Sequence, residues 1–393
     1  MTRDVVILSA TRSAVGGFGG SLSHMEPAEL AGQVMKAAVE QSSADPQTIN
    51  YVTVGNCIPT ESRFAYVARV AAIQAGLPME SVAMAVNRLC SSGLQAIVST
   101  AQSIMLNDCD YGIGGGVEIM SRGVYMSPAM RSGARMGDSA MIDSMVATLT
   151  DPFGVGHMGI TAENLAEKWG ISREEQDALA VESHRRAAQA IAEGRFKSQI
   201  TPVVIKTRKG ETTFDTDEHV RPDTTLEGLA KMRPAFKKDG TVTAGNASGI
   251  NDGAAFMVLA SAEAAAQAGQ KPMARIVSYA VAGVSNEIMG EGPIPASKLA
   301  LKKAGMTMGQ MDVIESNEAF AAQAIAVARG LELDMAKTNP NGGAIALGHP
   351  VGCSGAFIAT KALYELERIG GKYALVTMCI GGGQGMAVVF ERL

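Results

Sequence analysis

An internal repeat constrains the fold of this chain more than any other feature of its sequence. Strand-like apolar runs that end in Asn occur at 52–56 and 313–317, which are 261 residues apart. A Ser-Gly pair opens a helical pattern at 92–93 and again at 354–355, and a Tyr begins an apolar run at 111 and at 373. Both of these separations are 262 residues. Landmarks in such a constant register indicate two homologous halves, each of which must form the same supersecondary unit.

The two halves also begin in the same way. Strands are predicted at 5–9 and 275–278, and helices follow at 27–40 and 295–303. Each half then reads strand, helix, strand, helix, strand, which is typical of a mostly parallel sheet with helices on both faces. With 393 residues, of which 47% are hydrophobic, the chain can bury more than one core. The fold class is therefore α/β, and we expect two sheets that pack through a shared helical layer.

A long insertion interrupts the repeat. Its Met-rich, Gly-rich and basic stretches have no counterpart in the second half, and a capping box of Ser172 and Glu175 predicts a helix through Ala192, ended by Gly194. We predict three units: an N-terminal half of residues 1–119 plus 251–270, a loop domain of residues 120–250 inserted in it, and a C-terminal half of residues 271–393. An insertion above the strand ends is a natural place for a substrate lid.

Charge argues against nucleic acid or a membrane as a partner. The formal net charge of −5 provides no general attraction for polyanions or anionic lipid. Residues 195–238 nevertheless carry ten Lys and Arg against six Asp and Glu, which fits either a local anion site or an ordinary solvated loop. The charge-free stretches at 90–107 and 338–360 contain polar residues or prolines and glycines, so neither reads as a membrane span. The first residues do not resemble a signal or transit peptide, and a cytoplasmic location is expected.

The cysteine and glycine patterns exclude two further classes. The five cysteines are odd in number and lack metal-like spacing, so we expect reduced thiols and no metal site. The G-x-G-x-x-G at 154–159 lies inside the insertion instead of closing a strand, and no G-x-x-x-x-G-K-[ST] occurs. A nicotinamide or nucleotide-hydrolysis function therefore has little support.

Cys90 is the first candidate for chemistry. It stands in NRLCSSG (87–93), between a strand-like run at 83–86 and a helical pattern. At a helix N-terminus, unpaired N–H groups and the helix dipole favour a thiolate and can hold an oxyanion. A cysteine is more often a small buried hydrophobe. We interpret the remaining isolated thiols in that way: Cys57, Cys109 and Cys353.

His349 and Cys379 are the other two candidates. His349 lies in the charge-free, glycine-rich segment GGAIALGHP (342–350), where an imidazole could take a proton from a thiol. The alternative is a histidine bonded to loop carbonyls. Cys379 ends a buried strand pattern, at the strand end where open α/β sheets bind ligands. Because burial raises the pKa of a thiol, Cys379 suits proton exchange, and Cys90 is the better thiolate.

Four segments together resemble the thiolase family in order and spacing: NRLCSSG (87–93), NEAFA (317–321), GHPVG (348–352) and CIGGG (379–383). The resemblance covers the whole chain and implies the thiolase fold, in which two homologous βαβαβ halves form a five-layered α/β/α/β/α sandwich with a loop domain. It implies an acyltransferase that condenses acyl-CoA with acetyl-CoA, or cleaves a 3-oxoacyl-CoA with CoA, through an acyl-cysteine intermediate. CoA thioesters would be the substrates, with no permanently bound cofactor.

The resemblance also implies a division of labour. Cys90 would be the nucleophile, His349 the base that activates it, and Cys379 the group that removes a proton from the second acetyl-CoA. His349 with a water held by Asn317 would form one oxyanion hole. The N–H groups of Cys90 and Gly381 would form the other.

A set of substrate contacts follows from the same resemblance. The family segment that contacts the pantetheine arm and acyl group is similar to residues 156–164, a family serine bonds pantetheine, and a further residue lies near the CoA nucleotide. Two apolar side chains look like walls of the acyl pocket, although either could equally be core packing. In the order of the chain, the implied contacts are His157, Met158, Arg221, Ser248, Met289 and Phe320.

Two alternatives remain open at this point. A ketoacyl-synthase-like condensing enzyme has the same architecture but uses a cysteine with two histidines, or with a histidine and an asparagine. The second cysteine in the late glycine-rich turn favours a thiolase. A non-catalytic acyl-CoA or lipid carrier predicts binding without turnover. For assembly, the family implies a homodimer or homotetramer, with a tetramer contact expected near residues 125–136.

Overall fold

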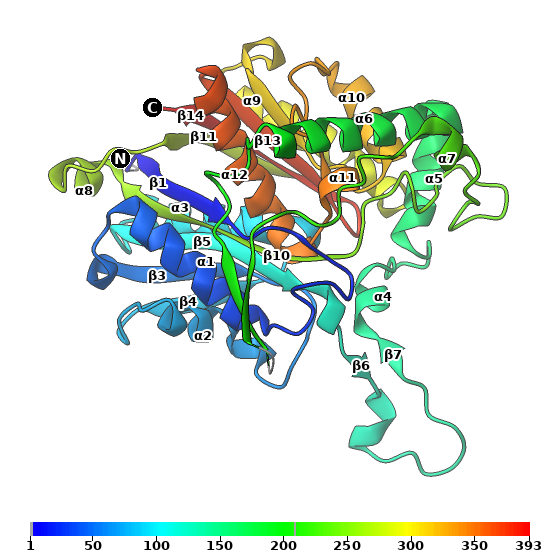
Figure 1. Ribbon diagram of the computed structural model, residues 1–393, viewed down its shortest axis with the longest axis horizontal. Helices are drawn as coiled ribbons and strands as arrows, with labels where there is room; N and C mark the ends of the chain where they lie inside the picture. The colour runs from blue at the N-terminus through cyan, green and yellow to red at the C-terminus, as the bar shows by residue number, and fades with distance from the viewer. Residues whose placement is uncertain (1–2, 208–209) are drawn as a thin grey trace.

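The strands of both halves join in one mixed sheet. The computed structural model describes residues 3–207 and 210–393, and ten strands of this part of the chain form the main sheet (Figure 1). From one edge to the other, the order is β12 (Val313–Ser316), β13 (Tyr373–Ile380), β14 (Gln384–Arg392), β11 (Ala274–Gly283), β1 (Val5–Arg12), β10 (Asn251–Ser261), β5 (Tyr111–Ile119), β3 (Ile49–Gly55) and β4 (Val82–Val86), with β2 (Gly16–Gly17) beside β10. The two half-sheets meet at a short β1–β11 ladder of two residue pairs.

The predicted repeat is visible in the strand order, but the prediction of a mostly parallel sheet is wrong. Parallel pairing is confined to β3–β4, β3–β5 and β12–β13 among the described strands of this sheet. The last strand of each half, β10 or β14, instead runs antiparallel to its neighbours. In the second half the cause is a hairpin at 381–383, where Gly382 and Gly383 have φ of 80° and 90°. In the first half the segment between β5 and β10 takes the place of this turn.

The five layers follow from the alternation of side chains along the strands. In β1, Val6 and Leu8 pack in one cluster with α1 (Pro27–Ser42) and α2 (Val67–Gln74), while Val5 and Ile7 face the opposite cluster. That opposite cluster contains the two central helices, α3 (Ser92–Met105) and α12 (Val351–Ile369). A third cluster joins the other half-sheet to α9 (Pro293–Ala304). The α/β/α/β/α sandwich is therefore confirmed.

The two central helices touch at the glycines of the repeated Ser-Gly pair. A Cβ atom added to Gly355 would lie 2.6 Å from Leu94 N, and one added to Gly93 would lie 3.0 Å from Cys353 O. Backbones can approach this closely only where no side chain intervenes. The repeat detected in the sequence thus marks the crossing point of α3 and α12.

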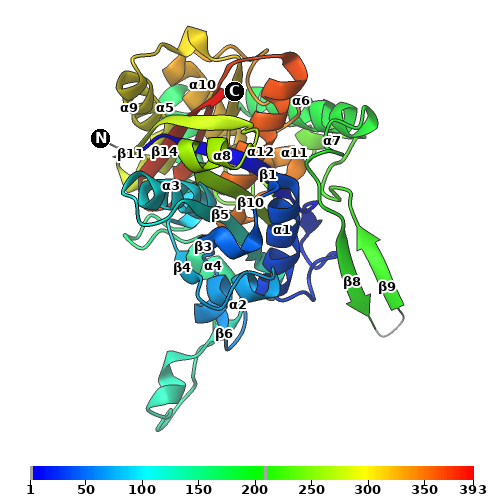
Figure 2. The same cartoon turned by 90° about the vertical axis from the view of Figure 1, so that its left-hand side faces the viewer.

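The segment predicted as a loop domain contains short strands and helices. Its elements are β6 (Tyr125–Met126), β7 (Ile142–Asp143), α4 (Ser144–Thr148), α5 (Met158–Trp169), α6 (Arg173–Ala192), β8 (Val203–Thr207), β9 (Gly210–Phe214) and α7 (Leu226–Ala230). The capping box of Ser172 and Glu175 is present, and the helix ends at Ala192, as predicted. The β6–β7 segment projects from the body in Figure 1, and the β8–β9 hairpin projects in Figure 2.

Three further helices complete the second half and the connection to it: α8 (Ala262–Gln267), α10 (Ala321–Leu331) and α11 (Ala344–Leu347). Within residues 3–207 and 210–393, none of the helices has both the length and the apolar character that a membrane crossing needs. The boundaries of the three predicted units stay a prediction.

Candidate active site

One cavity of about 370 Å³ brings most of the predicted site residues together. It lies between the strand ends of the two halves and the segment that contains α4 and α5, and its lining is largely apolar. Eight predicted residues line it: Cys90, His157, Met158, Ser248, Met289, Phe320, His349 and Gly381. Three predicted residues are not part of the lining: Asn317, Cys379 and Arg221.

Cys90 lies where the sequence predicts, in a turn between a strand and a helix. A 3₁₀ turn at Leu89–Ser91 follows β4 and leads directly into α3. Leu89 has a φ of 47°, a left-handed conformation that non-glycine residues rarely adopt, and Asn87 Oδ1 accepts its N–H at 2.9 Å. Hydrogen bonds from the backbone N–H groups of Gly381 and of Cys90 itself lower the pKa of the Cys90 thiol.

The backbone N–H groups at the turn favour the Cys90 thiolate, as the sequence predicts, but burial opposes them more strongly. Burial raises the pKa of Cys90 to about 11, although the hydrogen bonds from the backbone N–H groups lower it. Desolvation disfavours the charged form more than the helix start favours it. At neutral pH the thiol is protonated, so a base must remove its proton before it can attack.

His349 has the protonation state that such a base needs. It precedes α12, whose N-cap is Pro350, and burial lowers the pKa of His349 to about 4, so the imidazole is neutral at pH 7. Its Nδ1 lies 2.6 Å from Ser354 Oγ, which in turn lies 2.8 Å from Pro350 O. A carbonyl has no proton, so the hydroxyl donates to Pro350 and accepts from Nδ1–H. Nε2, which has no hydrogen-bond partner among the described residues, therefore carries the free lone pair.

Cys379 lies just behind the cavity wall at the end of β13. It is fully buried in an apolar cluster that includes Met158, Met289 and Phe320. Burial, and then the nearby Cys90 thiol, raise the pKa of Cys379 well above its ordinary value. The sequence argument for a buried thiol with a raised pKa is thus confirmed, and the two thiols are electrostatically coupled.

Asn317 and its repeat counterpart Asn56 have diverged in environment. Asn56 Nδ2 donates to Val117 O and to Glu118 Oε1, both at 2.8 Å. Both side-chain polar atoms of Asn317 are buried without a hydrogen-bond partner among the described residues. Buried amides are normally paired, so an Asn with both groups free is suited to bind a water or a ligand oxygen.

Three aromatic rings pack against one another in another part of the cavity wall. The ring of His157 stacks on Phe236 with centroids 4.7 Å apart, and Phe236 meets Phe320 edge-on at 6.0 Å. His157 is also the N-cap of α5, because its Nδ1 accepts from Gly159 N at 3.1 Å. Ser248 is tied to the same wall by its N–H, which donates to Ala319 O at 3.0 Å.

Arg221 lies in a neighbouring cavity of about 350 Å³, together with His184 and His219. The two cavities share three wall residues, Ala244, Ala247 and Gly249. A long ligand could therefore extend from Cys90 to Arg221. Two cations of the basic segment, Arg208 and Lys209, lie outside the described residues.

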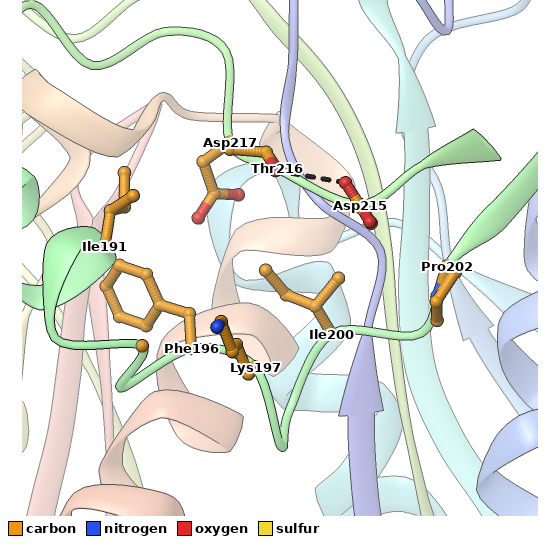
Figure 3. A pocket seen from close by; sticks show the side chains of 9 residues that line it. Ile191, Phe196, Lys197, Ile200, Pro202, Asp215, Thr216 and Asp217 are labelled. Carbon is orange, nitrogen blue, oxygen red and sulfur yellow. Dashed lines mark hydrogen bonds between the residues drawn. The ribbon is translucent and has the colours of Figure 1, made fainter.

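A third cavity, of about 260 Å³, has no lining residue in common with the cavity of Cys90 (Figure 3). It lies where the segments around Phe196 and Asp217 come together. Asp217 is not free, because both of its oxygens bond the buried Arg12 guanidinium at 2.7 and 2.9 Å. None of the predicted site residues lines this cavity.

Sequence reasoning missed three residues near the site: Ser354, Phe236 and Glu118. Ser354 lies one helical turn from Pro350 and could have been found as a partner of His349. Glu118 is an acid at the end of an otherwise apolar strand, which is itself a signal, because unpaired buried carboxylates are rare. Phe236 has no comparable signal in the sequence.

Comparison with known proteins identifies the family. Residues 5–263 match the family described as Thiolase, N-terminal domain, and residues 270–392 match Thiolase, C-terminal domain. The chain belongs to the thiolase family. It is 56% identical over 394 residues to Beta-ketothiolase BktB of Cupriavidus necator, with 100% of both chains covered. It is 49% identical to an Acetyl-CoA acetyltransferase of Chromobacterium violaceum, which covers 99% of this chain and 100% of the relative.

Solved structures agree with this assignment. The acetyl-CoA acetyltransferase of Bacillus anthracis superimposes with a TM-score of 0.98 at 45% identity, over 100% of this chain and 99% of that one. Human mitochondrial 3-ketoacyl-CoA thiolase in complex with CoA superimposes with a TM-score of 0.96 at 45% identity, over 100% and 98%. This thiolase therefore catalyses CoA-dependent Claisen condensation and thiolysis, which sets aside the ketoacyl-synthase-like and carrier alternatives.

Proposed function

We propose that this thiolase transfers the acyl group through Cys90, with His349 as its base. The supporting observation is that a protonated thiol and a neutral imidazole line the same cavity, with Nε2 of the imidazole unpaired among the described residues. His349 Nε2 takes the thiol proton, and the sulfur attacks the thioester carbonyl of acyl-CoA. The developing oxyanion is stabilised by the N–H groups of Cys90 and Gly381, the two backbone donors whose hydrogen bonds lower the pKa of the Cys90 thiol.

Cys379 is proposed as the acid and base at the second position. Because the pKa of Cys379 is raised, its thiol is protonated and can give its proton to the departing CoA thiolate. The Cys379 thiolate that remains then removes a proton from the α-carbon of acetyl-CoA. The carbanion attacks the acyl-Cys90 thioester, a carbon–carbon bond forms, and Cys90 leaves as the thiol with the proton held by His349. Thiolysis is the same sequence in reverse.

The remaining contacts complete the proposal. Asn317, with both polar groups unpaired in the described chain, holds the water that shares an oxyanion hole with His349. His157, Met158 and Ser248 contact the pantetheine arm, and Arg221 lies toward the CoA nucleotide in the adjoining cavity. Met289 and Phe320 form the wall beside the acyl group.

The division of labour is tested by two variants. Cys90→Ser should lose acyl-enzyme formation, whereas Cys379→Ser should still be acylated but condense poorly. Mass spectrometry after mixing with acetyl-CoA locates the acyl group, and acetoacetyl-CoA absorbance follows thiolysis. Equal acylation at both cysteines of the wild-type enzyme would contradict the assignment, as would full activity of Cys90→Ser.

We also propose that the enzyme is a homodimer that pairs through β4. This strand is the last in the sheet order, and its apolar side chains are unusually open, with Val82 and Met84 55% and 38% exposed. A free apolar edge strand is a ready surface for a second chain. Met84→Lys should give a monomer in analytical ultracentrifugation. A dimer that survives this change would show that β4 is not the contact.

The projecting β6–β7 segment is proposed as the contact between dimers in a homotetramer. It carries large exposed apolar side chains, of which Met136 is 96% and Tyr125 61% exposed.

CoA thioesters are proposed as the ligands without a permanently bound cofactor, so dialysis against a chelator should leave thiolysis unchanged. In the described residues, no group of three or more His, Cys, Asp or Glu side chains is placed to hold a metal. The cytoplasmic location stays a prediction.

A further inference from the structure

Glu118 is a fully buried acid that the proposed mechanism does not use. It lies near the end of β5, and its exposed fraction is 0%. Burial raises the pKa of Glu118 to about 7, since removing a carboxylate from water disfavours its charge. A buried carboxylate lowers the stability of the fold unless hydrogen bonds compensate for the lost hydration, so the contacts of Glu118 decide what it does.

The contacts of Glu118 join the two halves of the protein. Oε1 accepts from Ile58 N at 3.1 Å and from Asn56 Nδ2 at 2.8 Å. Oε2 accepts from Cys57 N at 3.1 Å and from Gly352 N at 2.9 Å. The first three donors follow β3 of the N-terminal half, whereas Gly352 is in the first turn of α12. One carboxylate thus holds two segments that are nearly 300 residues apart in the sequence.

Each of these segments leads to one catalytic group. On one side, Cys57 Sγ lies 3.1 Å from Ser92 Oγ and 3.3 Å from Leu89 O, so the Cys57 thiol supports the turn that presents Cys90. The hydroxyl of Ser92 also donates to Leu89 O at 2.7 Å. This contact helps to hold the left-handed Leu89 immediately before the nucleophile.

On the other side, Gly352 N belongs to the helix start that carries the base. Gly352 is three residues after His349 and two before Ser354, the partner of Nδ1. A carboxylate at a helix N-terminus satisfies a free N–H group and interacts favourably with the helix dipole. The fit is close, because a Cβ atom on Gly352 would lie 2.6 Å from Glu118 Oε2.

We propose that Glu118 is a positioning residue that sets the distance between Cys90 and His349 by anchoring the nucleophile turn and the base helix to one carboxylate. The inference rests on the roles proposed above for these two residues. Glutamine cannot replace the carboxylate, because it has one acceptor oxygen, and its NH₂ group would face N–H donors. A small misplacement of reacting groups lowers the rate steeply. Glu118 itself does not line the cavity, so we expect KM to change much less than kcat.

The test compares Glu118→Gln with Asp312→Asn. Asp312 is a matched control, because its carboxylate also accepts two backbone N–H bonds, from Lys372 at 2.7 Å and Tyr373 at 3.0 Å, but at the far end of β13. Melting temperature, kcat and KM for thiolysis of acetoacetyl-CoA, and the rate of Cys90 acylation in a single turnover are measured. Glu118→Gln should lower kcat about 100-fold with KM within about twofold, and acylation should slow in parallel. Asp312→Asn should change the melting temperature alone.

Several outcomes would overturn the inference. They are a kcat for Glu118→Gln within about threefold of wild type, or a lost kcat with an unchanged rate of Cys90 acylation. If Glu118→Gln does not fold, Glu118→Asp decides, because the shorter acid keeps the charge but cannot reach both Cys57 and Gly352. Its kcat should fall about 10-fold, and a wild-type kcat would refute the role. Cys90→Ser in the same assay separates the nucleophile assignment from the positioning role of Glu118. Full activity of Cys90→Ser would refute Cys90 as the nucleophile, whereas the role of Glu118 is judged by the kcat of the Glu118 variants.

Discussion

Replacing Ser354 by Ala tests the protonation state assigned to His349. Ser354 is fully buried, and its hydroxyl donates to Pro350 O and accepts from His349 Nδ1–H at 2.6 Å. Without the hydroxyl, Nδ1–H has no acceptor, and the imidazole can escape the penalty by moving its proton to Nε2. The proton acceptor that faces the cavity is then lost, although the ring and the thiol remain.

The size of the effect follows from the cost of an unpaired buried donor. That cost is about 1–3 kcal/mol, which corresponds to a decrease in kcat of about 5- to 160-fold. KM should stay close to wild type, because Ser354 does not line the cavity. The acylation step should slow by the same factor, since it is the step in which His349 takes the Cys90 proton.

The assay is thiolysis of acetoacetyl-CoA, combined with single-turnover acylation of Cys90. Ser278→Ala is the matched control, because this buried serine donates to Ala300 O at 2.7 Å in the outer layer, far from the cavity. It should lose stability of about 1 kcal/mol and keep its kcat. A Ser354→Ala enzyme with the kcat of the Ser278→Ala control would refute the tautomer assignment.

Two further predictions concern packing and pH. Gly355→Ala should lower the free energy of unfolding by about 1–3 kcal/mol in urea titrations, because its Cβ would lie 2.6 Å from Leu94 N. Gly309→Ala should change it by less than about 0.5 kcal/mol, because its Cβ would be in ordinary contact with Thr307 Oγ1 at 4.0 Å. A neutral result for Gly355→Ala would contradict the tight helix crossing. Because burial lowers the pKa of His349 from 6.5 to about 4, its contribution to stability is present above pH 6.5 and is lost as the pH falls toward 4. The wild-type enzyme should therefore lose more stability than His349→Gln between pH 7 and 5, and kcat/KM should show no acid limb near pH 6.5; a limb there, or parallel stability curves, would disprove the low pKa.

Local patterns were enough to predict the repeat and many of its elements. Apolar runs at 52–56 and 313–317 correspond to β3 and β12, and the helix predicted from the capping box at Ser172 ends at Ala192. The turn that presents Cys90 could be predicted for the same reason, since a strand, a short turn and a helix lie next to one another in the chain. Such features depend on neighbouring residues, which the sequence shows directly.

Strand direction could not be predicted in the same way. The alternation of strands and helices indicated parallel pairing, but β10 and β14 return antiparallel. β10 does so against β1 and β5, which are distant in the sequence, whereas β14 turns back on β13 through the hairpin at 381–383 and then pairs with the distant β11. The triple glycines show the same limit. Those at 381–383 form the β13–β14 hairpin, whereas those at 114–116 lie inside β5, where Gly116 approaches Gly352 O so closely that a Cβ would be 2.1 Å away.

The sequence by itself determined the duplicated architecture and the three reactive side chains, because periodicity and turn preference depend on residues that are close together in the chain. Tertiary structure decided how those side chains are charged and what holds them. Burial keeps Cys90 a thiol and His349 neutral, and Glu118 bonds Asn56 while Asn317 keeps both of its polar groups unpaired among the described residues. These properties depend on desolvation and on contacts between residues distant in the chain, which arise only when the two halves pack together.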